Sequence, residues 1–175
     1  MKKQIGILIA GTANPHIPGY CRGVANDPGH PWRIIAVAED DPARMGNIRE
    51  ILKYKEVKYY SDWRRMLDAH PEADAVQIGS DNKYHFGMFK EAMARGLHIY
   101  STKVPTMDAE EGAELLKLSA DYPKTIQVEL ELHFNPQFRY ARELVRSGRL
   151  GRIQSVYLTN ISQSPCNYFP NWGDP

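Results

Sequence analysis

The sequence predicts an α/β fold built on a doubly wound parallel sheet, and two patterns carry this prediction. Short, largely apolar runs alternate with longer amphipathic stretches through most of the chain. Runs that are apolar throughout are typical of strands whose two faces are both buried. Strands that alternate with helices form parallel sheets through right-handed crossovers. We therefore expect one sheet with helices on both of its faces.

Each expected element follows from its local pattern. The apolar runs predict strands at residues 4–9, 33–38, 57–60, 75–79, 98–101 and 125–130. The amphipathic stretches between them predict helices at residues 18–25, 42–53, 62–69, 84–95 and 109–119. A further helix is expected at residues 136–147, where apolar residues recur on one face.

Residues that favour helix ends support these boundaries. Asp108 and Glu111 have the spacing of a capping box, in which each carboxylate accepts from a backbone N–H at the start of a helix. Gly96 and Gly148 follow helical stretches, where a left-handed residue ends a helix. Asn135 precedes a proline, and this pair favours the first position of a helix.

The chain divides into two predicted domains. Residues 1–124 carry the alternating pattern and form the doubly wound domain. Residues 125–175 contain a strand, a helix and an apolar stretch at 153–159 that predicts another strand, and they resemble the incomplete start of a second α/β domain. The 175 residues suit one domain, or one domain with part of another.

The composition argues against several kinds of partner. Lys and Arg total 22 and Asp and Glu total 21, which gives a net charge of +1. We therefore expect neither a nucleic acid nor an anionic membrane surface as a partner, and no apolar run is long enough to span a bilayer. Cys21 and Cys166 cannot form a disulfide framework, so we expect a cytoplasmic protein with free thiols.

The sequence lacks the motifs of several enzyme classes. The six histidines form no HxxxH or HxH pair, so we expect no metal site. There is no Gly-x-Ser-x-Gly elbow and no P-loop, so a serine hydrolase and an NTPase have no support.

Ligands of open α/β sheets bind at the carboxyl ends of the strands, so the candidate site residues are those that follow each strand. The first strand leads into Gly11, Thr12, Ala13 and Asn14, where a dinucleotide-binding turn would lie. Of the three glycines in that fingerprint only Gly11 is present, and Ile9 and Asn14 occupy the other positions. Asn14 tolerates a positive φ better than most residues. An ordinary strand-to-helix loop is the alternative.

Acidic residues follow the second strand. Glu39 lies roughly 20–30 residues past the glycine turn, where a carboxylate accepts hydrogen bonds from the ribose hydroxyls of NAD. The acidic run should repel a 2′-phosphate, so NAD is favoured over NADP as the cofactor. Asp40 or Asp41 could instead cap the helix that begins at Pro42, and both roles can hold.

The fourth and fifth strands are also followed by polar residues. Ser80 and Asn82 could line a cofactor, and His85 should lie in the first turn of the next helix. A purely structural role is the alternative for this histidine. Lys103 follows the fifth strand, where a lysine inside a cleft could transfer a proton. The alternative is a solvated surface lysine.

Several ordered motifs together resemble the Gfo/Idh/MocA oxidoreductase family. Residues 60–67 and 73–85 are similar to the family's "D-x-x-x-L-L … D-A-V-x-I-A-T-P-N-x-x-H" stretch, and residues 92–103 to "A-L-x-x-G-K-H-V-x-x-E-K-P". Residues 134–136 and 147–151 resemble "R-F-N-P … x-S-G-x-L-G". The resemblance covers about residues 4–160.

The resemblance implies a Rossmann domain that binds NAD or NADP, followed by an α/β substrate domain with an open sheet. It implies hydride transfer to or from a carbon of a sugar or polyol, and a homo-oligomer, because the open sheets of the family usually pair. The lysine beside the nicotinamide and the reacting hydroxyl would be Lys103. Ribose recognition would fall to Glu39. The other implied cofactor contacts are Gly11, Thr12, Ala13, Asn14, Ser80, Asn82, His85 and Lys103 itself.

The sequence departs from the family pattern in ways that keep a second hypothesis open. The glycine fingerprint is reduced, the glutamate before Lys103 is replaced by Thr102, and the proline falls one place late, at Pro105. The arginine expected near His133 is absent. The chain also stops before most of the family's substrate domain. The alternative to an oxidoreductase is therefore a non-catalytic nucleotide-binding or interaction module.

Overall fold

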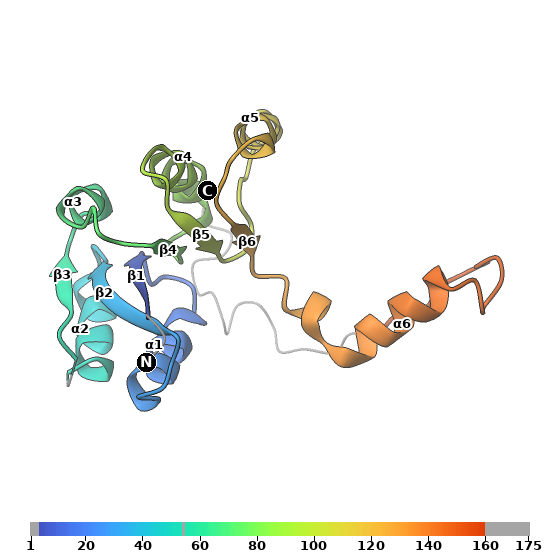
Figure 1. Cartoon of the computed structure of the whole chain (residues 1–175), viewed down its shortest axis with the longest axis horizontal. Coiled ribbons are helices and arrows are strands. Elements are labelled where there is room, and N and C mark those ends of the chain that lie inside the picture. The colour runs from blue at the N-terminus through green and yellow to red at the C-terminus, as the bar shows by residue number, and fades with distance from the viewer. Residues whose placement is uncertain (1–3, 54, 160–175) are drawn as a thin grey trace. The chain divides into compact units, whose positions relative to one another are not determined.

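The computed structural model describes residues 4–53 and 55–159 and confirms the predicted α/β class. Within these residues, parallel strands form one six-stranded sheet in the order β3-β2-β1-β4-β5-β6 (Figure 1). The strands are β1 (Ile5–Ala10), β2 (Trp32–Ala38), β3 (Lys58–Tyr60), β4 (Ala75–Ile78), β5 (His98–Ser101) and β6 (Ile126–Val128). This strand order is that of a Rossmann fold.

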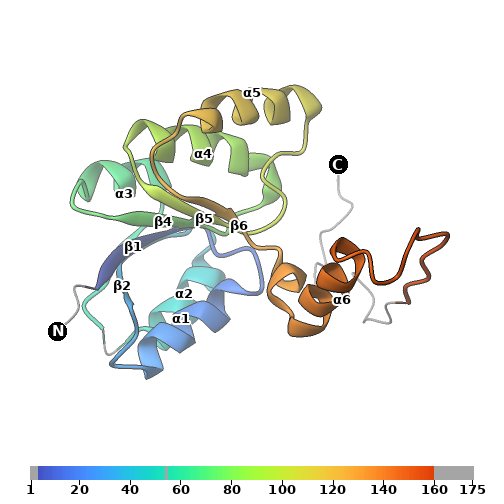
Figure 2. The same ribbon diagram turned by 45° about the vertical axis from the view of Figure 1, so that its right-hand side comes forward.

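Helices connect the strands and cover both faces of the sheet. They are α1 (Ile17–Asn26), α2 (Pro42–Ile51), α3 (Trp63–Ala69), α4 (His85–Ala94) and α5 (Ala109–Ala120), with α6 (Pro136–Arg146) and the short 3-10 turns η1 (Asn82–Tyr84) and η2 (Glu131–Phe134). Figure 2 shows α1 and α2 on one face, and α3, α4 and α5 on the other. None of the helices in the described residues is long and apolar enough to cross a bilayer.

Each face of the sheet has its own apolar core, because successive residues of a strand point to opposite faces. Leu8 packs in one cluster with Met66 of α3 and Phe89 of α4. Its neighbour Ile7 packs in the other cluster with Ile17 of α1. Burial of each such side chain contributes about 1.5–3 kcal/mol to folding. The two cores hold the carboxyl ends of the strands in a fixed register.

The direction of the sheet reverses at its centre. From β1 the chain moves outward through β2 to β3, then returns to place β4 on the other side of β1. The connections that leave β1 and β4 therefore run to opposite faces, and a crevice opens between them at the carboxyl ends of these strands. The candidate residues after β1, β2, β4 and β5 all lie along this edge.

The sheet extends further along the chain than the predicted first domain. β6 pairs with β5 in parallel, so the first compact unit runs to Glu129, beyond the predicted boundary at residue 124. The second unit starts at Leu130 and contains α6. The expected strand at residues 153–159 is not formed, because no neighbouring segment of the described residues supplies the ladder of hydrogen bonds that a strand needs. Cys166 lies outside the described residues.

Most of the predicted helix ends are found. The Asp108 side chain accepts from the backbone N–H groups of Glu110 and Glu111, and Asn135 accepts from Gln137 N. Within the described residues, only the Asp108 half of the predicted capping box is formed, because Glu111 does not accept from Asp108 N. Gly96 and Gly148 have φ values of 68° and 72° after α4 and α6. These caps satisfy backbone groups that a helix end leaves without partners.

Candidate functional site

Two glycines allow the loops on either side of the crevice to approach each other. Gly11 has a φ of 80°, and a Cβ on it would lie 2.5 Å from Ser80 Cα. A Cβ on Gly79 would lie 2.4 Å from the side chain of Ile17, the first residue of α1. Only glycine fits at position 11, because a Cβ there would meet the Ser80 backbone. At position 79 a Cβ would displace the Ile17 side chain and would lie 3.0 Å from Gly11 O. The close approach is thus achieved with one glycine from each loop.

The other two fingerprint positions have different roles. Ile9 is buried in the core between the sheet and α1. Asn14 does not take the positive φ that its residue type permits, since among the described residues only glycines have one. Its backbone N–H donates to Gly79 O at 2.9 Å, and its Oδ1 accepts from His16 N at 2.9 Å. Asn14 therefore closes the turn before α1 with hydrogen bonds.

Glu39 directly follows β2 and is 6% exposed. Its Oε2 accepts from Thr12 N at 2.7 Å and from Thr12 Oγ1 at 2.6 Å. Its Oε1 accepts from Asp41 N and from Arg44 Nη2, each at 2.9 Å. Burial opposes ionisation of this carboxyl, but the hydrogen bonds from Arg44, Thr12 and Asp41 outweigh it and lower its pKa to about 2. Glu39 is therefore a fixed negative charge beside the β1–α1 loop.

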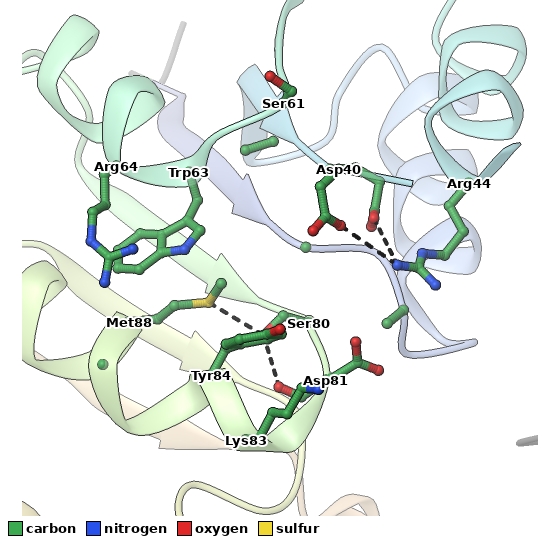
Figure 3. A pocket seen from close by; sticks show the side chains of 15 residues that line it. Asp40, Arg44, Ser61, Trp63, Arg64, Ser80, Asp81, Lys83, Tyr84 and Met88 are labelled. Carbon is green, nitrogen blue, oxygen red and sulfur yellow. Dashed lines mark hydrogen bonds and ion pairs between the residues drawn. The ribbon is translucent and has the colours of Figure 1, made fainter. Parts of the chain in front are cut away.

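Asp41 and Arg44 complete the hydrogen-bonded group around Glu39. The Asp41 side chain accepts from Arg44 N at 2.8 Å and caps α2, as the sequence predicts. Arg44 Nη2 also lies 3.7 Å from the exposed carboxylate of Asp40 (Figure 3). The Arg44 side chain is 38% exposed, so it is the donor to Glu39 that a ligand can most easily replace.

A cavity of about 390 Å³ occupies the crevice beside Glu39. Four of the predicted site residues line it: Gly11, Ala13, Glu39 and Ser80. The cavity brings together the ends of β1, β2 and β4, which are far apart in the sequence. A site of this size and position suits the adenosine part of a dinucleotide.

The opposite wall of the cavity consists of residues that the sequence analysis did not single out. Trp63, Tyr84 and Met88 give it an apolar and aromatic surface, and Arg64 and Lys83 add positive charge (Figure 3). The Arg64 guanidinium lies 4.1 Å from the centre of the Trp63 ring. Trp63 directly follows Asp62, the N-cap of α3, which lies in the loop after the short strand β3. This place at the carboxyl end of a strand is the signal by which the sequence could have identified Trp63 as a site residue.

The remaining predicted residues, Thr12, Asn14, Asn82, His85 and Lys103, do not line this cavity. Thr12 and Asn14 hold the β1–α1 loop through the contacts given above. Lys103 is half-buried in the loop after β5, where its peptide bond to Val104 is cis. Asn82 begins the 3-10 turn η1.

His85 is the first residue of α4, as predicted, and it is fully buried. Its Nδ1 lies 2.7 Å from Val104 O and its Nε2 lies 3.0 Å from Ser80 O. The ring therefore connects the loop that carries Ser80 with the loop that carries Lys103. This arrangement makes His85 a positioning residue for both loops.

The strand order, the close glycine approach and the acidic residue at the end of β2 define a dinucleotide-binding Rossmann domain. A sequence model of the oxidoreductase family with an NAD-binding Rossmann fold, GFO_IDH_MocA, matches residues 5–130. The chain therefore belongs to this family, and the cofactor of the family is NAD.

Individual relatives agree with this assignment. An uncharacterized oxidoreductase of Synechocystis is 30% identical over 80% of this chain and 37% of its own length. D-glucoside 3-dehydrogenase of Escherichia coli is 27% identical over 97% of this chain and 46% of its own length. The crystal structure of scyllo-inositol dehydrogenase from Lactobacillus casei with bound NAD(H) and scyllo-inositol has a TM-score of 0.73, at 24% identity over 86% of this chain and 43% of that one. The chain thus spans less than half the length of these relatives.

Proposed function

We propose that this chain is the cofactor-binding part of an NAD-dependent oxidoreductase that transfers a hydride to or from a carbon of a sugar or polyol. The observation that carries the proposal is the cavity at the carboxyl ends of β1, β2 and β4, with ionised Glu39 on one wall and Trp63 on the other. The substrate class is supported by two relatives, the D-glucoside 3-dehydrogenase of Escherichia coli and an inositol 2-dehydrogenase of Rhizobium meliloti, which is 27% identical over 81% of this chain.

The residues present fit the parts of NAD. The adenine would lie against Trp63 and Tyr84, which line the cavity. The pyrophosphate would bind at the β1–α1 loop, where the pyrophosphate of a dinucleotide lies in a Rossmann fold. The first turn of α1 itself offers few donors, because Ile17 N donates to Asn14 O and Pro18 has no N–H. The nicotinamide would then lie beyond Ser80, toward the loop that contains Lys103.

Ribose recognition at Glu39 involves an exchange of donors. A carboxylate has about four acceptor positions, and Thr12, Asp41 and Arg44 together fill them. A ribose hydroxyl would therefore replace the Arg44 guanidinium at Oε1. The other three hydrogen bonds come from the backbone and from buried Thr12, and they would keep the carboxylate in place.

Lys103 is the residue proposed to handle the proton. Bound NAD⁺ would accept the hydride of an alcohol that is oxidised, and the O–H proton of that alcohol would have to go to a base. In the proposal, Lys103 Nζ takes this proton and returns it in the reverse reaction. His85 supports this role because it holds Val104 O, next to Lys103 in the chain.

The test is Lys103→Ala in the complete enzyme that carries both this domain and a substrate domain. We expect kcat with sugars and polyols to fall by about 10²–10⁴-fold, the range for general acid–base groups. NADH affinity should stay within about twofold, because Lys103 lies outside the adenosine cavity. Turnover close to that of the unchanged enzyme would overturn this role.

A non-catalytic nucleotide-binding module is the second candidate. It is favoured by the replacement of the family's Glu-Lys-Pro by Thr102-Lys103-Val104. Turnover by the unchanged protein separates the two candidates, because a non-catalytic module would bind NADH and oxidise no sugar or polyol. A cytoplasmic homo-oligomer is part of the main proposal, and the mass of the purified protein in solution tests the oligomer.

A further inference from the structure

A second set of polar residues lies at the carboxyl edge of the sheet, on the β5–β6 side. Thr102 directly follows β5 and Glu129 directly follows β6. Ser101 pairs with Val128 in the parallel register, so the next residues, Thr102 and Glu129, are level with each other. Because side chains alternate along a strand, both point to the face of the sheet opposite to that of Ser101 and Val128.

One oxygen of Glu129 is firmly held. His16 Nδ1, from the β1–α1 loop, lies 2.7 Å from Oε1. The Tyr20 hydroxyl donates to the same oxygen, and it lies 3.2 Å from the Tyr100 hydroxyl. Burial and the hydrogen bond with Glu129 raise the pKa of Tyr20, so the phenol keeps its proton and remains a donor. The carboxylate is therefore fixed in orientation by α1 and by the loop before it.

The other oxygen of Glu129 has no such contact. Within residues 4–53 and 55–159, neither Glu129 Oε2 nor Thr102 Oγ1 has a hydrogen-bond partner. Glu129 is only 5% exposed and Thr102 is 0% exposed. Buried polar atoms in proteins are nearly always hydrogen-bonded, so two unpaired atoms at adjacent positions call for an explanation.

Their place in the sheet indicates what could pair with them. The adenosine cavity lies on the β2 and β4 side of the β1–α1 loop. A dinucleotide crosses the carboxyl edge of a Rossmann sheet with its pyrophosphate at this loop, so its other half extends to the β5–β6 side. That half ends in a nicotinamide ring with a carboxamide, which has an N–H₂ donor and a carbonyl acceptor. Glu129 Oε2 is an acceptor, and the Thr102 hydroxyl can donate.

We propose that Glu129 and Thr102 bind the carboxamide of the NAD nicotinamide. The carboxamide N–H₂ donates to Glu129 Oε2, and the carboxamide oxygen accepts from Thr102 Oγ1. Since Lys103 follows Thr102 directly, this pair would also fix the ring next to the proton-handling residue. The inference rests on the proposed function, because it assumes that this chain binds the dinucleotide.

The test compares three ligands by calorimetric titration of the 175-residue chain. They are NAD⁺, nicotinic acid adenine dinucleotide, in which a carboxylate replaces the carboxamide, and ADP-ribose, which lacks the nicotinamide. The unchanged chain should bind NAD⁺ at least about tenfold more tightly than the acid analogue, because Glu129 would face a second carboxylate and lose a donor. In Glu129→Gln this preference should disappear, so that NAD⁺ and the acid analogue bind with about equal affinity, while the affinity for ADP-ribose stays unchanged.

A matched control and a second variant keep the test decisive. Glu39→Gln should weaken the binding of all three ligands alike and leave the preference for NAD⁺ over the acid analogue intact, because it acts on the adenosine side. If Glu129→Gln does not fold, Thr102→Val replaces it. This variant should weaken NAD⁺ binding several-fold without changing the affinity for ADP-ribose. An unchanged preference in these variants would refute the carboxamide site and leave the two atoms to a bound water. Failure of ADP-ribose to bind the unchanged chain would refute the proposed function itself, and this inference with it.

Discussion

The ionisation of Glu39 should make the stability of the first unit depend on pH. In the folded chain its pKa is lowered from an ordinary 4.5 to about 2 by hydrogen bonds from Arg44, Thr12 and Asp41. Because the folded pKa is the lower one, the stabilisation is complete above pH 4.5 and is lost as the pH falls toward 2. The perturbation that isolates this effect is Glu39→Gln, which keeps the shape of the side chain and removes its charge.

The magnitude follows from the same two pKa values. A tenfold change in an acid dissociation constant corresponds to about 1.4 kcal/mol. The difference between 4.5 and about 2 therefore corresponds to about 3 kcal/mol of unfolding free energy at neutral pH. This conversion applies because Glu39 is only 6% exposed, so solvent screens its hydrogen bonds little.

The assay is urea unfolding of the unchanged chain and of Glu39→Gln across this pH range, followed by tryptophan fluorescence. The unchanged chain should be about 3 kcal/mol more stable at neutral pH, and the difference should narrow steadily below pH 4.5. Glu72→Gln is the matched control: hydrogen bonding to His70 also lowers the Glu72 pKa, but this side chain is 57% exposed and should have a much smaller effect. A difference between Glu39→Gln and the unchanged chain that is the same at every pH would refute the reasoning.

Two further substitutions test the walls of the crevice. Gly11→Ala should lower the free energy of unfolding by about 1–3 kcal/mol, because its φ is 80° and its Cβ would meet the Ser80 backbone at 2.5 Å. Gly19→Ala in α1 is its control and should stabilise the chain by about 0.5–1 kcal/mol, since a Cβ there has open space; equal effects of the two changes in urea unfolding would contradict the account. Trp63→Leu should weaken NADH binding about fivefold in a fluorescence titration, because stacking on an aromatic ring contributes about 1 kcal/mol. An unchanged NADH affinity would show that Trp63 does not bind the adenine.

Local patterns in the sequence predicted the sheet and the edge where the site lies. Apolar runs at residues 33–38 and 75–79 are close to β2 and β4, because strands buried on both faces tolerate few polar residues. Once the strands are placed, the carboxyl-edge rule selects Gly11, Glu39 and Ser80, which do line the cavity. These predictions depended only on neighbours in the sequence and on the order of elements.

The features that the sequence analysis missed depend on contacts between distant residues. Glu129 meets His16 across 113 residues, and no local pattern indicates that pairing. The fingerprint places Asn14 where a glycine would fall, whereas the residue that meets the β1–α1 loop is Gly79, which follows β4. The apolar stretch at residues 153–159 has the composition of a strand, but a strand also requires a partner, which composition does not supply.

The most direct test of the central claim is a titration of this chain with NADH, followed by nicotinamide fluorescence, alongside Glu39→Ala. We expect saturable binding that Glu39→Ala weakens at least about tenfold, because the change removes the acceptor of Thr12, Asp41 and Arg44 together. Far-UV circular dichroism of the variant confirms that it is folded. Absence of binding up to millimolar NADH, or equal binding by the folded variant, would contradict the claim that this edge of the sheet binds NAD.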